Sequence, residues 1–128
     1  MNSGLYLVTL MNEELISVNA HDARIAHLCI GVNRLNCKLG KARNLGTRAR
    51  NYAKTFGSHN VDFRPIALMD DVETAEHVIL RALAAWRLRS HRGRHTEWLR
   101  GIAPREAERI ALHALVEAGI EFRVPDVG

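Results

Sequence analysis

The stretch KLGKARNLGTRARNYAKTF, residues 38–56, predicts the end of a strand, a glycine turn and an amphipathic helix. We expect Gly40 in the turn, Asn44 as the N-cap of the helix, and Gly57 just past its C-terminus. At helical spacing, one face carries the apolar side chains that should be buried, namely Leu45, Ala49, Tyr52, Ala53 and Phe56. Arg48 lies at the edge of this face. It therefore points across buried surface and needs an anionic partner.

Four short motifs follow one another along the chain, and the second of them lies inside this stretch. They are Gly4-Leu5-Tyr6, then Lys38-Leu39-Gly40 followed by a basic run and Arg48, then Glu76 within TAEHVILRAL, and finally Glu97-Trp98-Leu99. Together they resemble the GIY-YIG nuclease family, and specifically its branches with K-(I/L)-G as the second motif. The resemblance covers most of residues 4–100. Each motif is common by itself, so the ordered set carries the weight.

Length and composition predict one ordinary domain. The chain has 128 residues with 47% hydrophobic content, which is enough to bury a core. We expect a single domain over residues 1–128, with a core at about 4–100 and a C-terminal helix at 104–118. No secretory or membrane-spanning run is evident, so we expect a soluble, cytoplasmic protein. Cys29 and Cys37 are too few for a disulfide framework or a zinc site, and we interpret both as core thiols.

Charge is segregated along the chain, although the net charge is only +4. Residues 23–61 contain eight Lys or Arg and no acid, and residues 77–96 contain five Arg and again no acid. Between these runs lie the acidic residues Asp70, Asp71, Glu73 and Glu76. Either run alone is typical of a solvated helix face. Two basic runs around one acidic cluster favour a surface that binds phosphates.

The strand pattern predicts an α/β fold with a small central antiparallel sheet of about three strands, flanked by helices. Residues 4–10, GLYLVTL, form the first strand, and residues 35–39 should pair antiparallel with it, which brings Tyr6 near Lys38. Residues 63–69, FRPIALM, form a third strand at a sheet edge, because Pro65 has no N–H to donate. Residues 14–20 are a further strand or an extension, and residues 21–30 a short helix.

A second helix is expected from a cap at Asp70 or Asp71 to about Leu88. Its apolar stripe includes Glu76, which a helical wheel directs inward. A buried carboxylate needs a cation, a hydrogen-bonded partner or a metal. An Arg48–Glu76 ion pair and a metal site are equally compatible with the periodicity.

The remaining C-terminal part is expected to hold an arginine-rich loop at 88–96, a Glu97-Trp98-Leu99 segment packed on the sheet, and a helix at 104–118 with Pro104 in its first turn. Glu97 is expected to have a structural role. His91, His95 and Glu97 suggest a metal cluster by spacing, but histidines in an Arg-rich loop are more often exposed or phosphate-facing.

The GIY-YIG resemblance implies a Mg²⁺-dependent endonuclease, with Mn²⁺ as a substitute. In this reading Glu76 holds one divalent cation and Arg48 clamps the phosphate. Tyr6 and Lys38 activate the water, and Tyr52 reaches the same phosphate. Lys38 replaces the usual tyrosine of the family, and it acts either by polarising water or as a base with a depressed pKa. For Tyr6 and Tyr52 the alternative is a core aromatic ring with a satisfied hydroxyl.

DNA is the expected partner, and the distribution of charge predicts which residues contact it: Lys41, Arg43, Arg50, Lys54, Arg89, Arg92 and Arg94. A homodimer is an open alternative. A second functional class is a catalytically inactive nucleic-acid-binding module on the same fold, and a third is a basic protein-interaction domain.

The gap between Tyr6 and Lys38 is longer than usual for the family, so this part of the chain contains an insert, for which residues 21–30 are a candidate. The insert could contact DNA, cover the site or form a dimer interface. A rival register with Cys29-Ile30-Gly31 as the second motif lacks the basic run and the arginine that should follow it.

Overall fold

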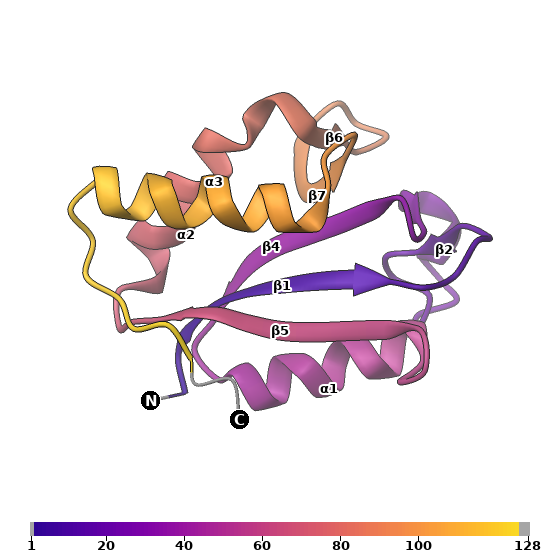
Figure 1. The fold of residues 1–128 in the computed structure, drawn as a ribbon. Coiled ribbons are helices and arrows are strands. Elements are labelled where there is room, and N and C mark those ends of the chain that lie inside the picture. The colour runs from indigo at the N-terminus through magenta and orange to yellow at the C-terminus, as the bar shows by residue number, and fades with distance from the viewer. Residues whose placement is uncertain (1, 126–128) are drawn as a thin grey trace.

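A five-stranded antiparallel sheet forms the centre of the computed structural model, which describes residues 2–125. Its strands, in the spatial order β5-β1-β4-β7-β6, are β5 (Val61–Leu68), β1 (Gly4–Leu10), β4 (Asn36–Ala42), β7 (His95–Arg100) and β6 (Arg87–Arg89). Helix α1 (Leu45–Phe56) covers one face, and α2 (Val72–Ala82) and α3 (Pro104–Glu117) cover the other (Figure 1). The α/β class and the antiparallel sheet with flanking helices are confirmed, but the sheet has five strands where about three were expected.

The two additional strands come from the stretch that was expected to be an arginine-rich loop. The turn at residues 90–94 joins β6 to β7, and β7 pairs with β4 through the register Lys38↔Trp98. Helix α2 consequently ends at Ala82, not near Leu88, and a 3₁₀ turn at Ala84–Trp86 leads into β6. Arg87 donates from Nε to the Thr96 carbonyl at 2.7 Å. Strand pairing therefore overrides the helical pattern in this segment.

Gly40 lies inside β4, so the expected turn at this position is wrong. In the β1–β4 ladder Gly40 is directly opposite Tyr6. A Cβ added at Gly40 would lie 2.6 Å from the Tyr6 Oη atom and 2.7 Å from Cζ, closer than real Cβ atoms approach. Glycine is present here because the Tyr6 ring packs on the backbone of the neighbouring strand. The chain turns later, at Arg43 and Asn44.

Local signals at the helix ends are confirmed. The Asn44 side chain accepts a hydrogen bond from the Thr47 N–H, and Gly57 ends α1 with φ = 89°. Asp71 caps α2 by accepting from the Thr74 N–H, and Pro104 is in the first turn of α3. Strand β5 is at the edge of the sheet, as Pro65 predicts, and the β1–β5 register shifts beside it.

The insert between the first two motifs contains little regular structure. Strands β2 (Ile16–Ser17) and β3 (Gly31–Val32) form a separate two-stranded sheet, and the expected helix at 21–30 is only a 3₁₀ turn at Ala26–Leu28. Ser17 accounts for part of this difference, since its hydroxyl binds the Ala26 carbonyl at 2.5 Å. Cys37 is a buried thiol as expected, whereas Cys29 is only partly buried. Within residues 2–125, none of the helices has the length and apolar character needed to cross a membrane.

Candidate active site

The face of the sheet under α1 brings four of the expected site residues together. Side chains alternate along a strand, so Lys38 and Gly40 of β4 are on the same face as Tyr6 of β1. Helix α1 contributes Arg48 and Tyr52, one turn apart. The sequence prediction that Tyr6 lies near Lys38 is confirmed by the β1–β4 pairing.

Hydrogen bonds and aromatic contacts connect these residues. The Tyr6 and Tyr52 hydroxyls are 2.8 Å apart, and Arg48 Nη1 is 3.4 Å from the Tyr6 hydroxyl. The Tyr6 ring stacks on Phe63 with centroids 4.6 Å apart and meets Tyr52 edge-on at 5.5 Å. Tyr6 is completely buried. Burial raises the pKa of Tyr6, and it raises the pKa of Tyr52 to about 12. Both phenols are therefore neutral at neutral pH.

Lys38 has an anionic partner that the sequence analysis did not assign to it. Its Nζ atom is 3.2 Å from Glu97 Oε2, and it also lies over the rings of Tyr52 and Trp98, 5.1 and 5.9 Å from their centroids. All three neighbours stabilise a positive charge. These contacts hold the Lys38 Nζ atom within the cluster, beside the Tyr52 ring.

Glu76 is buried as predicted, but its partner is Lys41 and not Arg48. Its Oε2 atom accepts from the Lys41 backbone N–H at 3.1 Å, and its Oε1 atom is 3.0 Å from Lys41 Nζ. The same ammonium is 2.6 Å from Glu73 Oε2. The hydrogen bond to Glu73, and to a smaller extent the one to Glu76, raises the pKa of Lys41. The Arg48–Glu76 ion pair was wrong because β4 continues past Gly40. Its alternation turns Lys41 toward α2 on the opposite face of the sheet.

An open edge of β4 connects the two groups of residues. Strand β7 pairs with β4 only at Asn36–Lys38, although β4 extends to Ala42. Three adjoining hollows surround this edge. One is lined by Lys41, Arg48 and Glu73, the next by Lys41, Glu76 and Arg87, and the third by Lys38, Tyr52, Arg87 and Glu97. Neighbouring hollows share Lys41 or Arg87 as a lining residue, and we refer to the three hollows together as the cleft at the open edge of β4.

The insert covers the Lys38 side of this cleft. Val18, Asn19 and Ile30 line the hollow that contains Lys38 and Tyr52. The insert is held to α1 by a 2.9 Å hydrogen bond between His21 Nδ1 and Thr55 Oγ1. Of the three roles considered for it, covering the site is the one that this packing supports.

The basic residues expected to contact DNA lie on several surfaces. Lys41 is engaged by the two glutamates, and Arg43 is 3.2 Å from Glu73 while remaining largely exposed. Arg50 and Lys54 are exposed on α1. The β6–β7 hairpin exposes the remaining three, which are Arg89, Arg92 and Arg94. Arg89 also donates to the Gly93 carbonyl and so stabilises the turn of the hairpin.

Two interactions of the site were missed by sequence reasoning. The Lys38–Glu97 pair needs β7 beside β4, and the signal for this strand in the sequence was weak, because HTEWLR, residues 95–100, does not alternate polar and apolar residues. The Lys41–Glu76 pair needs a continuous strand through Gly40. Cys37, Leu39 and Lys41 then fall on one face, a spacing that was present in the sequence but was interrupted by the expected turn.

The two carboxylates on α2 fit a divalent cation. Glu73 and Glu76 already enclose a positive charge, the Lys41 ammonium, and carboxylate oxygens are ligands that Mg²⁺ prefers. Within residues 2–125, no group of three or more His, Cys, Asp or Glu side chains is gathered as a metal site. The cluster of His91, His95 and Glu97 suggested by spacing is therefore not formed.

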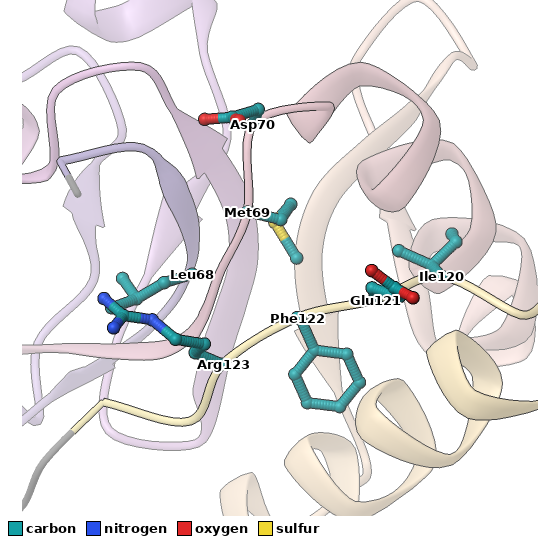
Figure 2. Close-up of a pocket in the computed structure, with 7 residues that line it drawn as sticks. All are labelled: Leu68, Met69, Asp70, Ile120, Glu121, Phe122 and Arg123. Carbon is teal, nitrogen blue, oxygen red and sulfur yellow. The ribbon is translucent and has the colours of Figure 1, made fainter.

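A separate hollow lies at the β5 edge of the sheet, where the segment after α3 crosses the end of β5. Figure 2 shows its lining: Leu68, Met69, Asp70, Ile120, Glu121, Phe122 and Arg123. An isolated bridge between Leu68 and Arg123 holds this segment in place. None of the expected site residues lines this hollow, so we place the candidate site at the open edge of β4.

Comparison with known proteins adds one finding. The family model of the T5orf172 domain matches residues 17–114, which include Lys38, Arg48, Tyr52, Glu76 and Glu97 but not Tyr6. No curated protein and no solved structure matches the chain. The T5orf172 domain is related to endonuclease-type domains of the GIY-YIG and HNH kinds, and its association with nuclease activity is loose. Since the match covers well over half of the chain, this protein belongs to the T5orf172 domain family.

Proposed function

We propose that this protein is a metal-dependent endonuclease of the GIY-YIG type that hydrolyses DNA phosphodiester bonds. The observation that carries the proposal is the cleft at the open edge of β4. Two cations, Lys38 and Arg48, lie on one side of this edge and the buried carboxylate of Glu76 lies on the other. A phosphodiester bound there meets cations that stabilise negative charge in the transition state. Membership of a nuclease-related family supports the same assignment.

Each residue of the cluster has a proposed role. Arg48 clamps the phosphate through its planar guanidinium, which can donate two parallel hydrogen bonds. Lys38 and Tyr6 activate the attacking water. Lys38 is the more accessible of the two, because 14% of its side chain is exposed whereas Tyr6 is fully buried. Tyr52 connects the group, since its hydroxyl binds that of Tyr6 and its ring faces the Lys38 ammonium.

Glu76, together with Glu73, would hold a Mg²⁺ ion, with Mn²⁺ able to replace it. When bound, such an ion stabilises the charge that develops on the phosphate and its leaving oxygen. Lys41 must then release the two carboxylates, and its ammonium becomes available to a phosphate in the same cleft. The exposed cations Arg43, Arg50, Lys54, Arg89, Arg92 and Arg94 bind the flanking DNA backbone.

A cleavage assay tests this proposal. Purified protein is incubated with single-stranded and duplex DNA in Mg²⁺ or Mn²⁺, alongside Glu76→Gln, which keeps the size of the side chain but removes its charge. Glu106→Gln is the matched control, because Glu106 is exposed on α3 and contacts only Arg109 among the described ion pairs. We expect cleavage by the wild type and by Glu106→Gln, and a loss of cleavage in Glu76→Gln, with all three folded by circular dichroism.

A second candidate is a DNA-binding module on the same fold without catalysis. The observation that favours it is that both oxygens of Glu76 are engaged by Lys41, as in a structural ion pair. In that case the wild type binds DNA with an affinity that falls steeply with salt, and it cuts neither form of DNA with either metal. Absence of DNA binding even at low salt would reject both candidates.

A further inference from the structure

The ion pair between Lys38 and Glu97 lies next to the proposed phosphate site. Lys38 is on β4 and Glu97 is on β7, and the Nζ to Oε2 distance is 3.2 Å. The Lys38 side chain is 14% exposed and that of Glu97 is 40% exposed. Lysine has a flexible four-carbon stem and many rotamers, so its ammonium stays in one position only when its surroundings hold it there. Glu97 is the acidic partner of Lys38 among the ion pairs of residues 2–125.

Two aromatic rings complete the surroundings of this ammonium. It lies 5.1 Å from the centroid of Tyr52 and 5.9 Å from that of Trp98. Trp98 and Glu97 are consecutive residues of β7, so one strand supplies both the carboxylate and an aromatic ring. The charge of Glu97 also reaches the rest of the cluster: burial is the main cause of the raised pKa of Tyr52, and the charge of Glu97 is a smaller cause that acts in the same direction.

We propose that Glu97 is a positioning residue, whose carboxylate holds the Lys38 ammonium over Tyr52 and facing the substrate phosphate. The inference rests on the proposed function. It replaces the purely structural role that the sequence suggested for Glu97. Glu76 has no part in it, because Glu76 binds Lys41 on the opposite face of the sheet.

The charges of Lys38, Arg48 and Glu97 allow an effect on DNA binding to be distinguished from an effect on catalysis. Lys38, Arg48 and Glu97 together carry a net charge of about +1, counting each as ionised. Glu97→Gln raises this charge, so phosphate attraction is kept or increased while the ammonium is no longer held in place. DNA affinity should therefore stay equal or become tighter, and the cleavage step should become slower. A loss of fold would instead lower both.

The experiment compares wild type, Glu97→Gln, Glu97→Asp and Glu106→Gln. DNA affinity is measured at one fixed salt concentration without metal, and the cleavage rate is measured in a single turnover. For Glu97→Gln we expect a rate roughly 10- to 100-fold lower, with affinity unchanged or tighter. Glu97→Asp should recover part of the rate because it restores the charge, and Glu106→Gln should match the wild type. A melting temperature within a few degrees of the wild type confirms the fold.

Two further readouts depend on Lys38 itself. Acylation of the Lys38 amine by an amine-reactive reagent, followed by mass spectrometry, should be faster in Glu97→Gln because the side chain of Lys38 is no longer held by Glu97. In a Lys38→Met background, Glu97→Gln should lower the rate no further, since Glu97 acts through Lys38. Equal cleavage rates for wild type and Glu97→Gln would overturn the inference while leaving the nuclease assignment intact. A wild type that cuts no DNA would reject the nuclease assignment, and the positioning role with it.

Discussion

The two faces of the central sheet are built from different kinds of side chain, although the same strands supply both. In β1, Leu5 and Leu7 point toward α2 and α3, and Tyr6 points toward α1. Among residues 2–125, the buried members of the α2–α3 face include no aromatic residue and are mainly Leu, Ile, Val and Ala. The α1 face is aromatic, with Tyr6, Tyr52, Phe56 and Trp98.

We interpret this difference as a division between a face that stabilises the fold and a face that supplies polar groups to the candidate site. An aliphatic face stabilises the fold through area and close packing, and it has no polar group to present to a substrate. Tyrosine and tryptophan bury comparable area but also provide hydroxyl groups and ring faces that bind cations. On the α1 face these groups hold Arg48 and Lys38. Apart from the Lys41, Glu73 and Glu76 group beside α2, we therefore expect substitutions on the α1 face to alter cleavage, and those in the aliphatic cluster of the α2–α3 face to alter stability.

The largest effect is expected for Arg48→Ala on the α1 face. Loss of the phosphate clamp should lower the cleavage rate by about 10²–10³-fold. Stability should fall by only about 1 kcal/mol, because the Tyr6 hydroxyl keeps its bond to Tyr52. Single-turnover cleavage and urea unfolding provide the two values. Arg105→Ala is the control, since Arg105 is exposed on α3, which covers the other face of the sheet. Equal rates for the two variants would contradict the clamp.

Leu115→Ala tests the opposite face. Leu115 of α3 is fully buried in the aliphatic cluster, and its truncation should cost about 2–5 kcal/mol of unfolding free energy. Cleavage per folded molecule should not change at a temperature where the variant remains folded. The neighbouring Val116 is 63% exposed, so Val116→Ala should have almost no effect. A selective loss of cleavage in folded Leu115→Ala would show that the faces are not separable.

Gly40→Ala tests whether the Tyr6 ring requires a residue without a Cβ atom on the neighbouring strand. The new Cβ would clash with the Tyr6 ring, so we expect a destabilisation of about 1–3 kcal/mol and slower cleavage as Tyr6 and Arg48 shift. Gly46→Ala is a matched control on α1, where a Cβ meets its neighbours at 3.5 Å or more and should stabilise by about 0.4–1 kcal/mol. Denaturant unfolding of both variants measures the contrast. A neutral Gly40→Ala would refute the close packing.

The smallest effect is a pH dependence of stability that arises from Tyr52. Burial raises its pKa to about 12, whereas an unfolded tyrosine titrates near 10. Above pH ~10 the unfolded chain loses this proton before the folded protein does, so stability falls as pH rises through about 10–12. Between pH 10 and pH 11 the loss should be roughly 1 kcal/mol. Tyr52→Phe should show a shallower decline in alkaline urea unfolding. An identical slope would exclude Tyr52 as the source.

Regular elements with local signals were largely predictable. The first strand was predicted at Gly4–Leu10, where the structure has it, because a β-rich run is bounded by polar residues. Helix α1 was predicted with both ends, since Asn44 and Gly57 satisfy its terminal backbone groups by local interactions. The β6–β7 hairpin was not predicted. Its arginines obscure the pattern of a strand, and its pairing depends on β4, whose paired residues lie 60 to 64 positions earlier in the chain (98 − 38 and 100 − 36).

The sequence by itself determined which residues would be buried or charged: the inward position of Glu76, the place of Arg48 at the edge of its helix, and the two basic runs. These follow from periodicity and composition, which are local properties. Only the tertiary structure decided the partners, pairing Glu76 with Lys41 and Lys38 with Glu97. Such pairs join segments 35 and 59 residues apart (76 − 41 and 97 − 38), and their contacts depend on strand register. A one-residue change of register would turn each side chain to the other face of the sheet.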